Sequence, residues 1–134
     1  MPFIKRYCNR IFFLFFILAL FSALPASAQS DGFKAITPEQ AREILETNKE
    51  AIALDVRPRE DFLNGHLVGA VHIPYTELEA RAPAELPDKN ATIVIYCKRG
   101  RSSLIAAITL AKLGYTNLYE FKGIDNWPFE TTKE

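Results

Sequence analysis

Short apolar runs alternate along this chain with segments that are expected to be helical. The runs are typical of buried strands and occupy residues 33–36, 51–56, 70–73, 93–96 and 115–121. The expected helices occupy residues 37–48, 58–63, 74–78 and 102–113. Prolines in residues 82–90 and the turn-rich residues 123–128 predict loops. Strands that alternate with helices predict an α/β fold whose mostly parallel central sheet is flanked by helices.

Two of the expected helices have clear boundary signals. Thr37 and Gln40 have the spacing of a capping box, which predicts that a helix begins there. Gly114 follows the longest helical pattern and is expected to cap its C-terminus. Ser102 and Ser103 open the same pattern, and the default role of serine at this place is to cap the helix.

The N-terminal 28 residues have the pattern of a secretory signal peptide. A basic start, an apolar stretch and a small-residue cleavage site follow one another at residues 5–10, 11–24 and 26–28. The apolar stretch is shorter than the roughly 20 residues that a membrane span needs. We expect cleavage after Ala28 and a single periplasmic domain over residues 29–134. The alternative is an uncleaved N-terminal anchor.

Cleavage would change both the charge and the cysteine content. The full chain has 16 basic and 16 acidic residues, and the signal segment takes three basic ones, which leaves a net charge of −3. Such a domain is a poor general binder of nucleic acid or of anionic membranes, so neither is expected as a partner. Cys8 would also be lost, and Cys97 would remain as the only cysteine. A lone cysteine in an exported domain indicates a reactive thiol or an intermolecular bond.

Cys97 lies where the strongest strand pattern meets the start of the strongest helix pattern. Ligands of open α/β sheets bind at this end of the strands. The next residues are three cations and a glycine, Lys98, Arg99, Gly100 and Arg101. Loop amides, the helix dipole and these cations all stabilise negative charge. The setting therefore favours a nucleophilic thiolate with a small anionic ligand beside it.

Two other interpretations of Cys97 are weaker. A buried, inert cysteine at a strand end is common, but it rarely has three cations in the next four residues. A cysteine phosphatase needs arginine six positions after the cysteine, and that position is Ser103. A metal site is not indicated either, because two histidines and one cysteine show no ligand spacing.

Several motifs together make the chain resemble the rhodanese family. They are LDVRP at residues 54–58, EDF-x-x-GHL-x-GAVHIP at residues 60–74, CKRGRS at residues 97–102, LGY-x-NL at residues 113–118 and KG at residues 122–123. The match spans nearly all of the expected domain and is most similar to single-domain periplasmic members of the phage-shock group. It implies a rhodanese-like three-layer α/β fold.

The resemblance also implies a reaction. The Cys97 thiolate would take the sulfane sulfur of thiosulfate, and the persulfide would pass this sulfur to cyanide or a thiol. The implied substrate-binding residues are Lys98, Arg99, Gly100, Arg101, Ser102 and Ser103. Many members of the family have arginine five positions after the cysteine, whereas here that position is Ser102 and the arginine comes one residue earlier. No cofactor or metal is implied, and we expect a monomer.

Residues outside the loop have open roles. Asp55 and Arg57 end a neighbouring strand and either orient the active site or form a structural ion pair. His66 and His72 are expected to hold the fold, and Trp127 is expected in the core rather than in the wall of the pocket. Two further functions would use the same cysteine: a non-enzymatic persulfide carrier that serves a partner protein, and a thiol-redox module.

Overall fold

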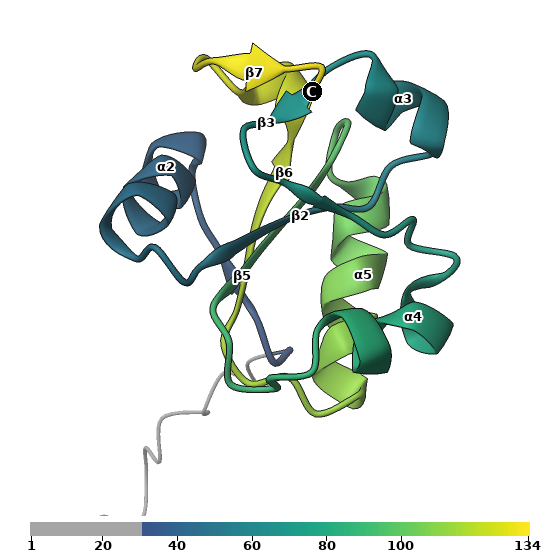
Figure 1. Ribbon diagram of the computed structural model, residues 1–134. Helices are drawn as coiled ribbons and strands as arrows, with labels where there is room; N and C mark the ends of the chain where they lie inside the picture. The colour runs from purple at the N-terminus through teal and green to yellow at the C-terminus, as the bar shows by residue number, and fades with distance from the viewer. Residues whose placement is uncertain (1–30) are drawn as a thin grey trace, which may run out of the picture.

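The computed structural model describes residues 31–134, so the expected signal peptide lies outside the described part. The chain folds around a five-stranded sheet of order β1-β6-β5-β2-β4, in which all neighbouring strands are parallel (Figure 1). Its strands are β1 (Lys34–Ala35), β2 (Ile52–Asp55), β4 (Val71–His72), β5 (Ile93–Cys97) and β6 (Leu118–Gly123). A separate antiparallel pair consists of β3 (His66–Leu67) and β7 (Thr131–Thr132).

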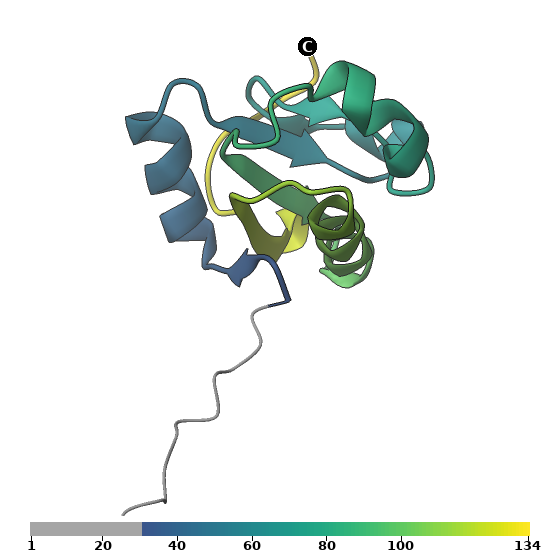
Figure 2. The same ribbon diagram turned by 90° about the horizontal axis from the view of Figure 1, so that it is seen from below.

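Helices lie on both faces of the sheet, which confirms the predicted three-layer α/β arrangement. Figure 2 shows α2 (Pro38–Thr47) on one face, with α4 (Leu78–Glu85) and α5 (Arg101–Lys112) on the other. The short segments α3 (Arg59–Leu63) and η1 (Ile124–Asn126) follow the carboxyl ends of β2 and β6. Within residues 31–134, none of the helices is both long and apolar enough to cross a membrane.

The central strand β5 is buried on both faces. Ile93, Ile95 and Cys97 belong to the apolar cluster under α4 and α5, whereas Val94 and Tyr96 belong to the cluster under α2. A strand that is covered on both faces has no solvent-facing positions, so it needs apolar side chains throughout. This explains why these residues form a continuous apolar run in the sequence, and it places Cys97 on the same side as α5.

The expected boundary of α2 is confirmed, whereas the expected start of α5 is wrong. Thr37 Oγ1 accepts a hydrogen bond from the Gln40 N–H at 3.2 Å, and Gln40 Oε1 accepts one from the Thr37 N–H at 2.9 Å. Helix α5 begins one residue earlier than predicted, after Gly100, and no side chain caps it. Neither serine is therefore a cap, and Ser103 is free to bond elsewhere.

The predicted loop over residues 82–90 is partly wrong, because α4 extends to Glu85 with Pro83 inside it. Proline costs a helix one hydrogen bond and a steric clash, which is why the sequence favoured a loop. Leu78 and Ala82 are fully buried in the core under this helix. Their burial, together with an ion pair between Arg81 and Glu85 at 2.6 Å, keeps the segment helical despite the proline.

Candidate active site

The loop after β5 is shaped by two glycines that lie far apart in the sequence. Gly100 has a φ of +115°, a conformation that residues with a side chain rarely adopt. Gly123, at the end of β6, touches the loop directly. A Cβ at this position would lie 2.1 Å from the carbonyl oxygen of Lys98. The loop can therefore rest on β6 only because residue 123 has no side chain.

Cys97 Sγ is almost completely buried at the base of this loop. It accepts a hydrogen bond from the Gly100 N–H at 2.9 Å. It also lies 3.3 Å from the carbonyl oxygen of Lys122 and 3.4 Å from Ser103 Oγ. The Gly100 amide stabilises negative charge on the sulfur, while the other two groups are available to accept the thiol proton.

A pocket of about 320 Å³ opens in front of Cys97. Its lining residues are Arg57, Pro58, Asp61, Cys97, Lys98, Arg99, Arg101 and Ser102. Four of these residues are cationic and one is acidic, so the pocket is electropositive and favours a small anion.

The structure brings all six predicted loop residues to Cys97, although they lie in different positions. Lys98, Arg99, Arg101 and Ser102 line the pocket, whereas Gly100 contributes its backbone amide. Ser103 is fully buried behind the sulfur and does not line the pocket. Arg99 is highly exposed and pairs with Asp125 at 3.2 Å, an arrangement that contributes little to stability and leaves the side chain able to move.

Of the two roles that the sequence left open for Asp55 and Arg57, the structure shows the ion pair. They form a buried ion pair of 2.6 Å, and Arg57 also donates to the carbonyl oxygen of Gly65 at 2.7 Å. Burial lowers the pKa of Arg57, but the hydrogen bond and the charge of Asp55 outweigh it, so the pKa is raised overall. Arg57 therefore stays cationic while it lines the pocket. The pair fixes the turn after β2 and holds Arg57 in the wall of the pocket.

His66, His72 and Tyr96 hold the neighbouring backbone in place. The ring nitrogens of His66 lie 2.8 Å from the carbonyl oxygens of Phe62 and Glu134. His72 Nε2 lies 2.7 Å from the carbonyl oxygen of Arg57. Burial, reinforced by the charge of Asp55, raises the pKa of Tyr96 far above its ordinary value, so the neutral hydroxyl accepts the Leu67 N–H.

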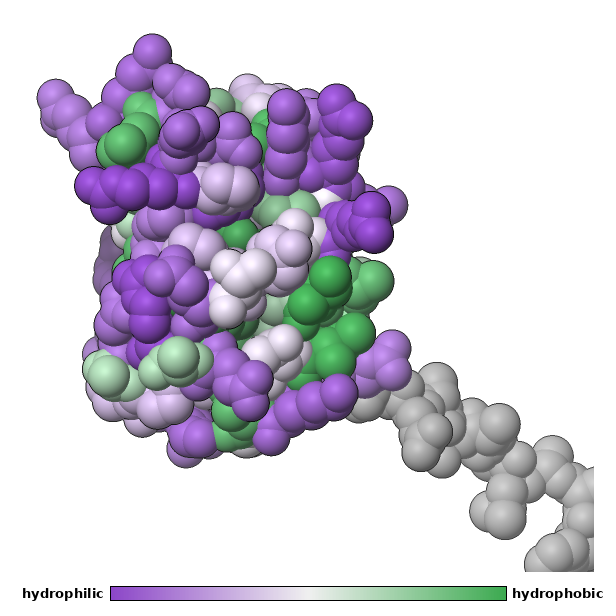
Figure 3. Space-filling view, turned by 90° about the vertical axis from the view of Figure 1, so that its right-hand side faces the viewer, coloured by the Kyte–Doolittle hydropathy of each residue, from purple (hydrophilic) through white to green (hydrophobic). Residues whose placement is uncertain are grey.

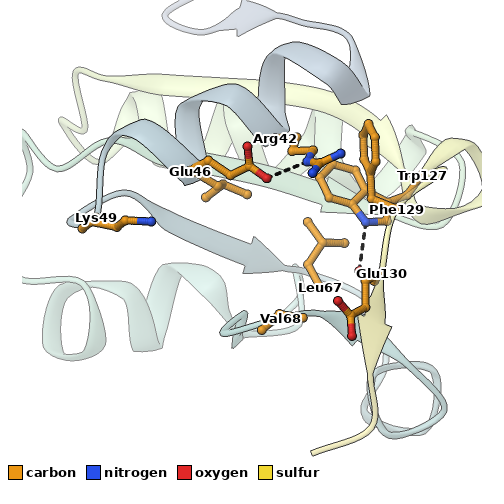
Figure 4. Close-up of a pocket in the computed structure, with 9 residues that line it drawn as sticks. Arg42, Glu46, Lys49, Leu67, Val68, Trp127, Phe129 and Glu130 are labelled. Carbon is orange, nitrogen blue, oxygen red and sulfur yellow. Dashed lines mark hydrogen bonds and ion pairs between the residues drawn. The ribbon is translucent and has the colours of Figure 1, made fainter.

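Trp127 lies in another part of the molecule. With Phe129 it walls a hollow of about 450 Å³ between α2 and the C-terminal segment, which shares no lining residue with the Cys97 pocket (Figure 4). The indole ring packs on the core residue Phe121, with the ring centroids 5.2 Å apart. Arg42 lies over the Phe129 ring and pairs with Glu46 at 2.6 Å, so these charges are already partnered.

The sequence analysis gave no site role to two residues beside Cys97, Glu120 and Lys122, although Lys122 belongs to the KG motif. Glu120 is buried in β6 and accepts hydrogen bonds from Ser103 Oγ at 2.6 Å and from the Lys122 N–H at 2.8 Å. Lys122 has a φ of +74°, the only positive φ of a non-glycine residue in the described chain. The available signal was an acidic residue inside an otherwise apolar strand pattern.

Across residues 31–134, no group of three or more histidine, cysteine, aspartate or glutamate residues converges as a metal site would.

Comparison with known proteins places this site in a family. A family model described as the rhodanese-like domain matches residues 37–128. Thiosulfate sulfurtransferase PspE of Escherichia coli strain K12 is 38% identical over 71 residues, which cover 53% of this chain and 68% of the relative. Thiosulfate sulfurtransferase GlpE of Pseudomonas aeruginosa strain LESB58 is 34% identical over 95 residues, which cover 70% of this chain and 82% of the relative.

A solved structure agrees with these relatives. A rhodanese with anions from E. coli aligns with a TM-score of 0.59 at 33% sequence identity, covering 63% of this chain and 99% of that one. The chain belongs to the rhodanese-like domain family. The predicted resemblance and fold are confirmed, and the names of the relatives support sulfur transfer in general.

The contact between Gly123 and the loop predicts that Gly123→Ala deforms the site. The backbone at Gly123 is extended, a conformation open to any residue, so alanine tests the close contact alone. We expect a loss of about 1–3 kcal/mol in the free energy of unfolding, measured by denaturant titration. Gly69→Ala gives the comparison for backbone strain alone, because a Cβ there meets open space while the φ of +75° disfavours a side chain. If Gly123→Ala were as stable as the wild type, the loop would not depend on this contact.

Proposed function

We propose that this protein is a thiosulfate sulfurtransferase that carries sulfur as a persulfide on Cys97. The observation that carries the proposal is the Cys97 sulfur, which accepts the Gly100 N–H at 2.9 Å at the base of an electropositive pocket. An amide that points at a sulfur stabilises both a thiolate and a persulfide anion. The pocket has room for a small donor such as thiosulfate.

The reaction has two steps, each a displacement at sulfur. In the first, the Cys97 thiolate attacks the outer sulfur of thiosulfate, an S–S bond forms, and sulfite leaves with the electron pair of the broken S–S bond. In the second, cyanide or a thiolate attacks the outer sulfur of the persulfide, and the Cys97 thiolate is regenerated. One cysteine is sufficient for such a ping-pong reaction.

The loop residues divide this work. The Gly100 amide bonds the sulfur itself. Arg101, with Lys98, Arg99 and Arg57 in the same lining, provides positive charge for the sulfonate group of the donor. Arginine suits this role because its planar donors match an oxyanion. In this arrangement Ser102 faces the ligand, whereas Ser103 acts on the sulfur from behind.

The cellular setting is part of the proposal. The signal-peptide pattern of residues 1–28 supports export to the periplasm and a mature domain of residues 29–134. There the domain would act as a monomer on small sulfur compounds, without nucleic acid, membrane or cofactor.

The first test is Cys97→Ser followed by mass spectrometry of the intact protein. After incubation with thiosulfate, the wild type should gain one sulfur atom, and the variant should gain none because a hydroxyl cannot form the persulfide. Circular dichroism shows whether the variant remains folded. Sulfur uptake by folded Cys97→Ser would exclude Cys97 as the sulfur carrier.

The second test concerns Arg101. Arg101→Ala should raise the thiosulfate KM about tenfold, equivalent to ~1.4 kcal/mol, because a cationic contact to the sulfonate is lost. Arg101→Lys keeps the charge without the planar donors and should show a smaller increase. Steady-state kinetics with thiosulfate as the varied substrate measure both. An unchanged KM in Arg101→Ala would remove its proposed role.

A second candidate function is a non-enzymatic persulfide carrier that docks on a partner protein. The observation that favours it is an exposed apolar strip on α5, formed by Leu104, Ile105 and Ile108. Figure 3 shows hydrophobic side chains gathered on this face of the molecule. The strip lies one to two helical turns from Arg101, next to the Cys97 pocket, where a partner's acceptor group would have to come.

Turnover separates the enzyme from the carrier. With excess thiosulfate and cyanide, an enzyme should release many equivalents of thiocyanate per protein molecule, whereas a carrier should bind one equivalent of sulfur and stop. We expect sustained thiocyanate release, measured colorimetrically. A single equivalent of bound sulfur without turnover would favour the carrier instead.

A further inference from the structure

We propose that Ser103 and Glu120 form a buried proton relay that ionises Cys97 without adding charge to the site. The inference rests on the proposed role of Cys97 as nucleophile. Ser103 would be the link that touches the reacting sulfur. Glu120 would be a positioning residue that acts through this hydroxyl.

Ser103 Oγ lies between the Cys97 sulfur and the Glu120 carboxylate, and it is also 3.0 Å from the carbonyl oxygen of Lys122. Ser103 Oγ lies 3.4 Å from Cys97 Sγ and 2.6 Å from Glu120 Oε1. All three residues are at least 95% buried, so water has little access to this side of the sulfur. A hydroxyl carries one proton. When Ser103 donates it to Glu120, the oxygen lone pairs can accept the thiol proton of Cys97.

The charge of Glu120 affects how Cys97 can lose its proton. Its carboxylate accepts the Ser103 hydroxyl and the Lys122 N–H, and no cation of residues 31–134 forms an ion pair with it. If the Cys97 proton left to solvent, two negative charges would lie one hydroxyl apart in a buried site. Like charges in such a place disfavour ionisation of both. A relay avoids this repulsion.

The proposed step conserves atoms and charge. The S–H bond of Cys97 breaks, the sulfur keeps the electron pair, and the proton passes to Ser103 Oγ. The original hydroxyl proton of Ser103 passes to Glu120 Oε1. The product is a thiolate that accepts hydrogen bonds from Ser103 Oγ and Gly100 N, beside a neutral Glu120 that donates to Ser103. The three side chains carry one negative charge before and after the step.

The other charged groups near the sulfur have a different effect. Arg57, Lys98, Arg99 and Arg101 line the pocket in front of it and stabilise the thiolate, but as cations they cannot accept its proton. Asp61 lines the same pocket from α3. On the neighbouring strands, the residues paired with Glu120 are the apolar Ala35 of β1 and Ile95 of β5. Just after β1, the Ile36 N–H bonds the Glu120 carbonyl. Lys122 of β6 bonds the carboxylate with its backbone N–H.

The test is the pH dependence of Cys97 alkylation by iodoacetamide, a neutral reagent that reacts with thiolates. In the wild type, the rate should change by less than about threefold between roughly pH 5.5 and 7.5, because internal transfer takes up no proton from solvent. In Glu120→Gln, it should rise about tenfold per pH unit, because Cys97 must then release its proton to water. Ser103→Ala should show the same slope, because it removes the link and keeps both ends.

Controls distinguish the relay from the proposed function. Glu50→Gln is the control variant, because it removes an exposed carboxylate that is distant from Glu120 in the sequence. It should keep the wild-type dependence of the alkylation rate on pH. Thermal unfolding verifies that each variant is folded. If Glu120→Gln does not fold, Ser103→Ala decides. A wild-type profile superimposed on those of folded Glu120→Gln or Ser103→Ala overturns the relay, whatever the sulfur uptake. The opposite result is also possible: the wild type takes up no sulfur from thiosulfate, but the three pH profiles are as predicted. That result would contradict the proposed function and leave the relay standing.

Discussion

The pairing of β5 between β2 and β6 is the constraint on which the rest of the structure depends. All three strands are parallel, so their carboxyl ends meet at one edge of the sheet. Asp55, Cys97 and Gly123 end these strands. The burial of β5 on both faces holds this edge in place and orients the Cys97 side chain toward α5. The loop, the pocket and the buried polar groups are all assembled around that orientation.

Strand β6 contributes several groups that surround the Cys97 sulfur. Ile95 pairs with Glu120, yet Cys97 pairs with Gly123, so β6 has one extra residue opposite the end of β5. This irregularity accompanies the positive φ of Lys122 and brings its carbonyl oxygen to 3.3 Å from the cysteine sulfur. Strand bulges commonly re-aim side chains near functional sites. Here the bulge also lets Glu120 reach Ser103.

The sequence allowed prediction of features that depend on neighbouring residues. The capping box at Thr37, the apolar run that ends at Cys97 and the cationic loop are local patterns, and each is present. The helix expected over residues 74–78 shares only Leu78 with α4, which lies further along the chain because burial of Ala82 overrides the local effect of Pro83. The β3–β7 pair joins two-residue strands about 65 residues apart, too short for any periodic signal. Glu120 was missed because its partner Ser103 is 17 residues away, across a bulge that the sequence does not reveal.

Two buried carboxylates at this edge of the sheet, Asp55 and Glu120, differ in the groups that bond them. Asp55 is neutralised by Arg57, and the raised pKa of Arg57 means that this partner keeps its charge. Both carboxylate oxygens of Asp55 are engaged by Arg57, so Asp55 fixes the wall of the pocket. Glu120 has only neutral donors, one of them the hydroxyl that touches Cys97. The ion pair therefore belongs to the wall of the pocket, whereas Glu120 lies behind the Cys97 sulfur and is linked to it through Ser103.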